Sequence, residues 1–128
     1  MQNPYEKYKQ QSVMTMTEGE MINLLFESAV NRLNKGILCL ETRDYEGSNT
    51  AFKKAESIFS HLSATLDMQY EISNNLAALY DFFYQKTMEA NVKKDPEPIR
   101  EILPLVTELK ESFVQADKNV RMQSQRSE

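Results

Sequence analysis

Few residues in this 128-residue chain could perform chemistry, and they do not form a recognisable set. Cys39 is the single cysteine and His61 the single histidine. One thiol and one imidazole cannot make the usual zinc ligand sets without several carboxylates. The sequence also has no glycine-rich loop of the kind that holds phosphates. The 19 acidic residues fall mostly on predicted polar helix faces, where solvation explains them. We therefore expect no enzyme active site, no metal and no cofactor.

His61 supports one alternative function, histidine phosphotransfer. Four-helix phosphotransfer domains carry a phosphorylated histidine on the bundle surface, usually followed three residues later by lysine and then glycine. Here Ala64 and Thr65 occupy those two positions, so a phosphoryl group would lack its nearby cation. A solvated helix histidine is the favoured interpretation of His61, and Cys39 is interpreted as a small buried hydrophobe.

Composition narrows the class of protein further. The net charge is -4 and the pI about 5.1, which argues against nucleic acid, because nucleic-acid binders usually carry a basic stripe. A lone cysteine favours a reducing compartment. No segment resembles a signal peptide or approaches the roughly 20 apolar residues that span a bilayer. These features predict a cytoplasmic protein of one domain, without membrane insertion.

Helical periodicity dominates the sequence and predicts an all-α fold. Short links between long helices are typical of an antiparallel up-down-up-down four-helix bundle. We expect a mobile N-terminal arm over 1–16, the bundle over 17–117 and a frayed polar tail over 118–128. Pro104 predicts a kink in the last helix, or a helix that becomes regular only after it. The four helices are expected at about 18–42, 44–66, 70–90 and 95–117.

Capping residues mark where the helices begin. Thr17 and Glu20 have the spacing of a capping box, in which each side chain satisfies a free backbone amide at the helix start. Asp44 and Asp67 are suitable N-cap residues for the second and third helices. Asp95 precedes a proline at the first helical position of the fourth, where the missing amide costs nothing.

The third helix is more apolar than a bundle requires. A core-facing stripe usually covers a little over ~100° of the circumference, whereas apolar residues here cover well over half. Neighbouring helices could cover the second face, or it could form a groove for an amphipathic partner helix. The stripe expected to face the core is Ile72, Leu76, Leu79 and Phe83, with Tyr80, Tyr84 and Phe82 beside it.

The N-terminal arm is a third way to cover this face. Tyr5 and Tyr8 are three residues apart and share one side of any helical turn. Val13 continues the apolar character. We expect these three residues to form a movable groove cover, or alternatively to pack permanently as core.

Several stretches of the sequence resemble the FliS family of flagellin export chaperones. Residues 13–21 (VMTMTEGEM) are similar to the family's Val-x-Thr-Ala-Ser-Pro-x-Glu-Leu, and residues 24–30 (LLFESAV) to its Met-Leu-Tyr-Asp-Gly-Ala-Ile. The order and spacing of the motifs are more specific than any one of them. Departures are Met16, Glu18, Gln69, Tyr70, Pro104, and Phe113 where a tryptophan is common. Further matches are at 54–55, 66–67, 71–72, 75–76, 79–81, 89–91 and 94–96.

This resemblance implies a function as well as a fold. FliS-like chaperones bind the C-terminal segment of flagellin in the cytoplasm, block its premature polymerisation and help deliver it to the flagellar export apparatus. The flagellar export gate or a co-chaperone is a further expected partner, and the chain is expected to be a monomer or weak dimer. The residues expected to contact flagellin are Ile72, Asn75, Leu76, Tyr80, Phe83 and Tyr84.

Overall fold

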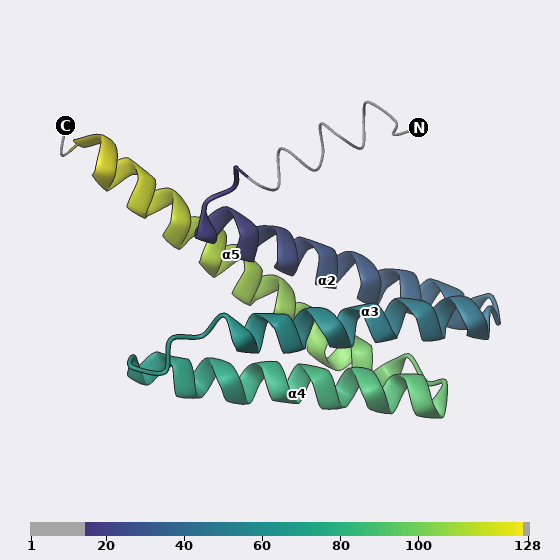
Figure 1. Ribbon diagram of the computed structural model, residues 1–128. Helices are drawn as coiled ribbons and strands as arrows, with labels where there is room; N and C mark the ends of the chain where they lie inside the picture. Colours follow the sequence, from purple (N-terminus) through teal and green to yellow (C-terminus); the bar gives the residue numbers. More distant parts are fainter. Residues whose placement is uncertain (1–14, 127–128) are drawn as a thin grey trace, which may run out of the picture.

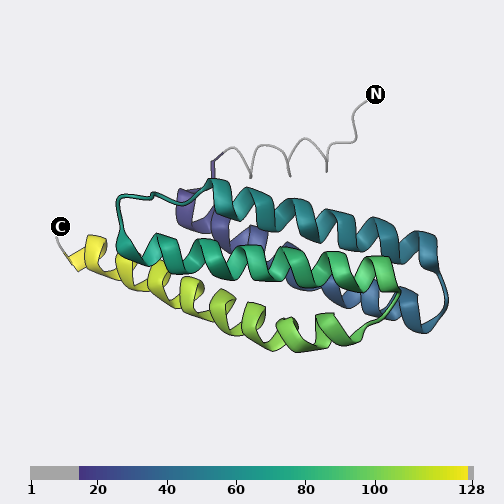
Figure 2. The same cartoon turned by 90° about the horizontal axis from the view of Figure 1, so that it is seen from below.

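The computed structural model describes residues 15–126, and these residues form four α-helices joined by short connections (Figure 1). Successive helices run in opposite directions, and α5 packs on α2 as well as on α4 (Figures 1 and 2). The predicted antiparallel up-down-up-down bundle is confirmed. No helix of this part of the chain is long and apolar enough to cross a membrane. The helices are α2 (Glu18–Glu41), α3 (Tyr45–Ala64), α4 (Glu71–Lys93) and α5 (Glu97–Arg126).

Three of the four helix starts follow the predicted caps. The Thr17 hydroxyl accepts a hydrogen bond from the backbone amide of Glu20 at 3.1 Å. The Asp44 carboxylate accepts one from the amide of Gly47 at 2.9 Å. Asp95 likewise accepts from the backbone amide two residues ahead, at 3.0 Å. Each bond satisfies an amide that has no partner within its own helix.

The start of α4 differs from the prediction, because Asp67 does not cap it. The N-cap is Tyr70, which makes no side-chain capping bond. Asp67 instead shapes the turn before the helix: its carboxylate accepts from the amide of Gln69 at 3.0 Å, and its carbonyl accepts from the hydroxyl of Ser73 at 2.6 Å. The α3–α4 connection is thus held by Asp67 from outside the helix.

Helix α5 is longer than the sequence predicts. It is continuous through Pro104, which removes one hydrogen bond from the helix and lies at an exposed position. The alternative of a helix that begins only after Pro104 is therefore wrong. The helix also continues to Arg126, past residue 118, where the polar tail was expected to begin. At 1.5 Å per residue its 30 residues span about 45 Å, against about 30 Å for the 20 residues of α3. The C-terminal part of α5 outreaches the rest of the bundle (Figure 1).

Aromatic rings join the helices in the core. Phe26 of α2 contacts Tyr80 of α4 and Phe113 of α5, with ring centroids 6.1 and 5.1 Å apart. Phe59 of α3 contacts Phe83 of α4 at 5.5 Å. Such ring pairs add about 0.5–1.5 kcal/mol beyond the area that they bury. One ring of α2 therefore holds both α4 and α5 in position.

A polar contact fixes the N-terminal part of α3 against the C-terminal part of α4. The side-chain amide of Asn91 donates to the Asn49 side-chain oxygen at 2.8 Å, and Asn91 in turn accepts from the Lys94 ammonium at 2.9 Å. Asn91 is buried, so an unmade bond here would cost more than the bond itself contributes. The contact therefore fixes the position of α3 relative to α4 along the helix axes.

Close packing of α2 on α3 depends on Gly36. A Cβ built on this glycine would lie 2.1 Å from a ring carbon of Phe52. Phe52 is fully buried, so its ring has no open space into which to move. The absence of a side chain at position 36 is what allows the two helices to approach.

Replacing Gly36 with alanine should destabilise the bundle. Overpacking a core costs about 1–3 kcal/mol. Because the surroundings of Phe52 are rigid, we expect this cost to exceed the ~1 kcal/mol that alanine gains over glycine in a helix. We expect the free energy of unfolding, measured in urea, to fall by about 1–2 kcal/mol. Ser57→Ala, at an exposed position of α3, serves as the control and should change it little. A Gly36→Ala variant as stable as the original chain would contradict this packing.

Candidate protein-binding site

The six residues expected to bind a partner lie on two different sides of α4 and at different depths. Ile72 is 63% exposed, and Asn75 is exposed beside it. Phe83 and Tyr80 are 0% and 1% exposed. The remaining two, Leu76 and Tyr84, are half-buried against the core. The predicted groove cover, Tyr5, Tyr8 and Val13, lies outside the described residues and stays a prediction.

The core-facing side of α4 is rotated from the predicted one. Ile72 and Leu79 were expected in the core, yet Ile72 is mostly exposed and Leu79 is 36% exposed. Tyr80 was expected beside the core, yet it is buried against Phe26. The expected placement of these three residues is wrong, because the rings of α2 and α3 decide which part of an over-wide apolar arc they bury. Truncating Tyr80 should consequently cost stability rather than binding alone.

The rotation leaves an apolar groove between α4 and α5. The groove has a volume of about 220 Å³ where α4 and α5 approach each other. Leu79 and Leu105, on facing helices, are 36% and 43% exposed there. An ion pair between Lys86 and Glu101, 3.2 Å apart, joins α4 to α5 closer to the α4–α5 connection. The lining residues are Leu79, Phe83, Leu105, Glu108, Leu109 and Ser112.

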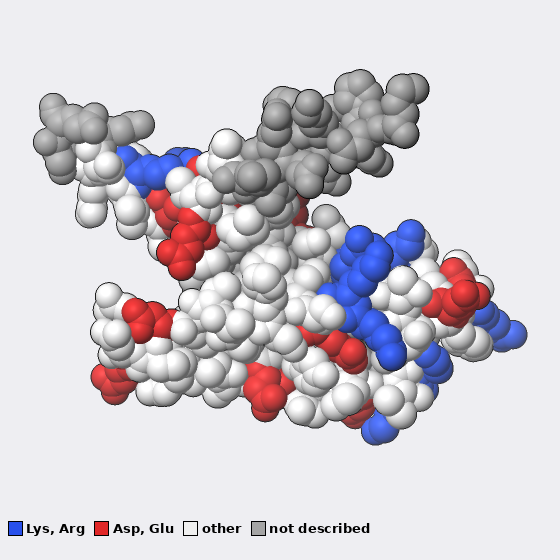
Figure 3. Space-filling model, in the orientation of Figure 1, with Lys and Arg blue, Asp and Glu red and all other residues white. Residues whose placement is uncertain are grey.

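At the end of the groove that lies away from the α4–α5 connection, the apolar side chains become more exposed. Val120 continues the stripe of Ile102 and Val106 along α5, but it is 63% exposed, whereas they are fully buried. Across from it, the α3–α4 connection exposes Met68 and Tyr70 by 57% and 65%. Figure 3 shows the molecule hollowed between these two parts. The C-terminal part of α5 and the start of α4 thus offer apolar side chains that the described bundle leaves uncovered.

The α5 side of this groove was not predicted from the sequence. Neither Leu105 nor Leu109 was among the residues expected to contact a partner, which were all placed on the third helix. A signal was present nevertheless, since an apolar stripe that includes Ile102, Val106 and Val120 extends past residue 117, where the fourth helix was expected to end.

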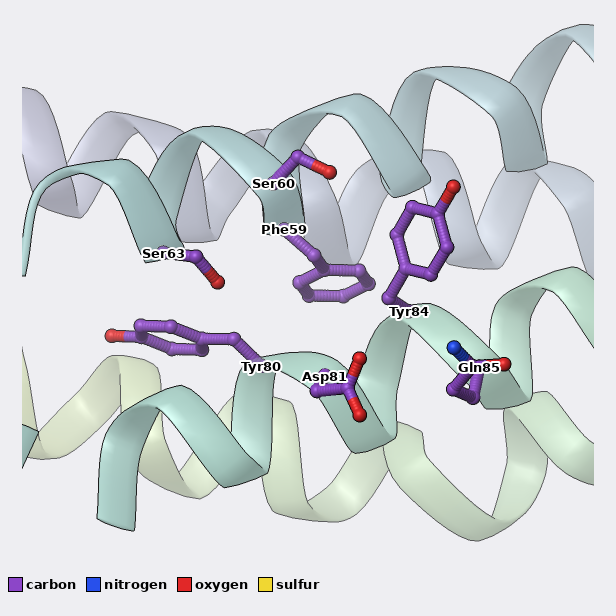
Figure 4. A pocket seen from close by; sticks show the side chains of 7 residues that line it. All are labelled: Phe59, Ser60, Ser63, Tyr80, Asp81, Tyr84 and Gln85. Atoms are coloured by element: carbon purple, nitrogen blue, oxygen red, sulfur yellow. The ribbon is translucent and has the colours of Figure 1, made fainter. Parts of the chain in front are cut away.

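A second hollow lies between α3 and α4. It has a volume of about 290 Å³, and both α4 tyrosines, Tyr80 and Tyr84, contribute to its lining (Figure 4). Burial raises the pKa of Tyr80 to about 12, so its hydroxyl keeps its proton above the pH at which an ordinary tyrosine ionises. Burial likewise raises the pKa of Glu56 on α3, and the positive charge of Lys53 opposes that shift.

Charge is unevenly distributed over this part of the molecule. Residues 55–85 contain four carboxylates and no lysine or arginine. In the view of Figure 3, acidic residues without basic neighbours lie by the α3–α4 connection, whereas lysines and arginines gather towards the opposite end of the bundle and on the C-terminal part of α5. Within residues 15–126, no group of three His, Cys, Asp or Glu side chains could hold a metal ion.

Comparison with known proteins identifies the family. The model of the family "Flagellar protein FliS" matches residues 1–120. The flagellar secretion chaperone FliS of Bacillus subtilis is 32% identical over 121 residues, which cover 94% of this chain and 91% of that protein. That of Salmonella typhimurium is 30% identical, over 90% and 87% of the two chains. This chain belongs to the FliS family.

A solved structure supports the fold of this FliS-family chain. A crystal structure of a bacterial flagellar chaperone matches with a TM-score of 0.74 and 21% identity, covering 90% of this chain and 95% of that one. The family is one of flagellar secretion chaperones, not of enzymes. The phosphotransfer alternative finds no support in these comparisons, and His61 is an exposed residue in the last turn of α3.

The raised pKa of Tyr80 predicts an alkaline loss of stability. In the unfolded chain its hydroxyl loses the proton near the ordinary pKa of 10.0, whereas in the folded chain it holds it to about 12. The contribution of Tyr80 to stability is therefore complete below pH 10 and falls as the pH rises from 10 to 12. Urea unfolding across this range should show a steeper decline for the original chain than for Tyr80→Phe.

The matched control for this experiment is Tyr45→Phe, which removes a phenol that is 49% exposed. Lysines also titrate between pH 10 and 12, and both variants retain all of them. Equal slopes for Tyr80→Phe and the original chain would show that the Tyr80 hydroxyl is not buried in solution.

Proposed function

We propose that this FliS-family chain binds the disordered C-terminal segment of flagellin in the cytoplasm, prevents its premature polymerisation and aids its delivery to the flagellar export apparatus. The observation that carries the proposal is the uncovered apolar groove between α4 and α5. Uncovered apolar surface of this kind is typical of protein-interaction sites. An amphipathic helix that lays its apolar face in such a groove is a common mode of peptide recognition.

The proposed binding also explains how the complex can hold its client and still release it. A disordered segment must lose conformational freedom when it folds onto its partner, and this cost offsets part of the gain from apolar burial. A flagellin segment lying in the groove would have its own apolar face covered, so it could not pair with other flagellin chains. The flagellar export gate or a co-chaperone remains a proposed further partner.

A calorimetric titration with the C-terminal segment of the flagellin from the same organism tests this function. We expect binding at one segment per chain, with a negative heat-capacity change from apolar burial. Circular dichroism should show more helix in the complex than in the two separate components. Absence of both heat and added helix would reject the proposed function.

The location of the binding surface is tested separately by Leu79→Gln and Leu105→Gln. Burying a leucine side chain contributes about 1.5–3 kcal/mol, and 1.4 kcal/mol corresponds to tenfold in affinity. Because both leucines are partly exposed, each variant should weaken binding about tenfold while the melting temperature changes little.

Leu38→Gln provides the matched control, since Leu38 is 58% exposed near the end of α2, away from the groove. Its affinity for the flagellin segment should equal that of the original chain. If the segment binds tightly and the three variants do not differ, the flagellin site lies elsewhere on the molecule, although the chaperone function stands.

A further inference from the structure

The recess between α3 and α4 is separate from the groove between α4 and α5. Helix α4 presents Leu79 to the groove and Tyr84 to the recess. At 3.6 residues per turn these two positions lie about 140° apart around the helix, so one straight helix cannot contact both. The recess volume of about 290 Å³ is roughly ten times the volume of one water molecule in the liquid. It is large enough to receive a long side chain.

The lining of the recess comes from two helices and mixes aromatic rings with oxygen atoms. In Figure 4 the rings of Tyr80 and Tyr84 flank the space from α4, one helical turn apart, and the hydroxyls of Ser60 and Ser63 reach it from α3. Asp81 stands at its edge. The complete lining is Phe59, Ser60, Ser63, Tyr80, Asp81, Tyr84 and Gln85.

The carboxylate of Asp81 has no cationic partner within residues 15–126. Asp81 is not among the five carboxylates that form ion pairs there, which are Glu41, Glu89, Glu97, Glu101 and Asp117. The next lysine along α4 is Lys86, which pairs with Glu89 and Glu101 instead. No lysine or arginine occurs between residues 55 and 85, where the carboxylates are Glu56, Asp67, Glu71 and Asp81.

Aromatic faces beside an unpaired carboxylate favour a cation. Lysine and arginine are attracted to the face of a tyrosine ring within about 6 Å of its centre, and arginine is found there more often. This chain already has one such contact, with the Lys86 ammonium 5.8 Å from the centre of the Phe82 ring. An anion would be repelled by Asp81, and an apolar group would strip water from the serine hydroxyls without replacing their hydrogen bonds.

We propose that the α3–α4 recess binds an arginine side chain from a basic segment of a protein partner, at a site separate from the α4–α5 groove. The guanidinium stacks on a tyrosine ring and donates to the Asp81 carboxylate and the serine hydroxyls. The planar guanidinium suits this combination better than the compact lysine ammonium. The surrounding acidic surface draws basic segments towards the recess and makes their binding sensitive to salt.

The proposal is tested with a short glycine–serine peptide that carries two arginines, titrated into the full chain and followed by NMR. The expected result is a set of shifts centred on the Tyr84 ring and the Asp81 amide, weakened by added salt. A counterpart with citrulline keeps the shape of arginine without its charge and should not bind. A lysine counterpart should bind more weakly than the arginine peptide.

Substitutions then separate charge from ring stacking. Asp81→Asn should weaken binding of the arginine peptide about two- to fivefold, which is the range expected for the loss of an exposed ion pair. Glu27→Gln removes the same charge at an exposed position of α2 and should leave its affinity unchanged. Tyr84→Phe keeps the ring and should retain binding, whereas Tyr84→Leu should lose it; melting temperatures check that all variants fold.

Three results would overturn the proposal. Shifts scattered over the acidic surface without preference for the recess would show non-specific attraction. Equal affinities for the Asp81→Asn and Glu27→Gln variants would show that Asp81 is not the contact. If the arginine peptide no longer binds once the flagellin segment saturates the chain, the recess is not a separate site. Since the probe contains no flagellin sequence, failure of the proposed flagellin binding would not by itself produce any of these results.

Discussion

The contact of Phe26 with two rings from other helices decides which surfaces of this bundle are buried and which stay open. Its ring meets Tyr80 from α4 and Phe113 from α5. For Tyr80 to reach it, α4 must turn its Ser73–Tyr80–Thr87 side towards the core, and these three residues are all buried. The same rotation turns Ile72 and Leu79 outwards. The open groove is therefore a consequence of how the core is packed, not an addition to a finished core.

Signals that act within a few residues made the helix starts predictable. Thr17 and Asp44 accept hydrogen bonds from amides three residues ahead, so the spacing of residue types is sufficient to recognise them. The rotation of α4 is different in kind. Its apolar arc is wide enough to satisfy several orientations, and rings at positions 26 and 59, far away in the sequence, select one of them. No pattern within residues 71–93 contains that information.

The length of α5 shows a similar division. Its apolar stripe is visible in the sequence as far as Val120, but the polar residues around it indicated a fraying tail. The helix instead continues to Arg126. Gly19 and Asp117 show what holds this part of α5 to α2: a Cβ on Gly19 would lie 2.2 Å from a carboxylate oxygen of Asp117. A carboxylate against the first turn of α2 is favourably placed for the positive end of the helix dipole. That contact joins residues almost one hundred positions apart, which sequence spacing cannot reveal.

The two halves of α4 differ in a way that the fold does not require. In its second half, Glu89 pairs with both Lys86 and Lys93, the usual arrangement of charges on a solvated helix face. Its first half has equally exposed positions, but apart from Glu71 and Asp81 they carry uncharged side chains such as Asn74, Asn75 and Ala78. Lysine at these positions would be compatible with the helix and would add solubility. Its absence keeps the surface of α4 beside the recess free of long basic side chains, which leaves room for another chain to approach closely. Packing explains the face that α4 buries, whereas the composition of the face that it exposes suits the partners proposed for the groove and the recess.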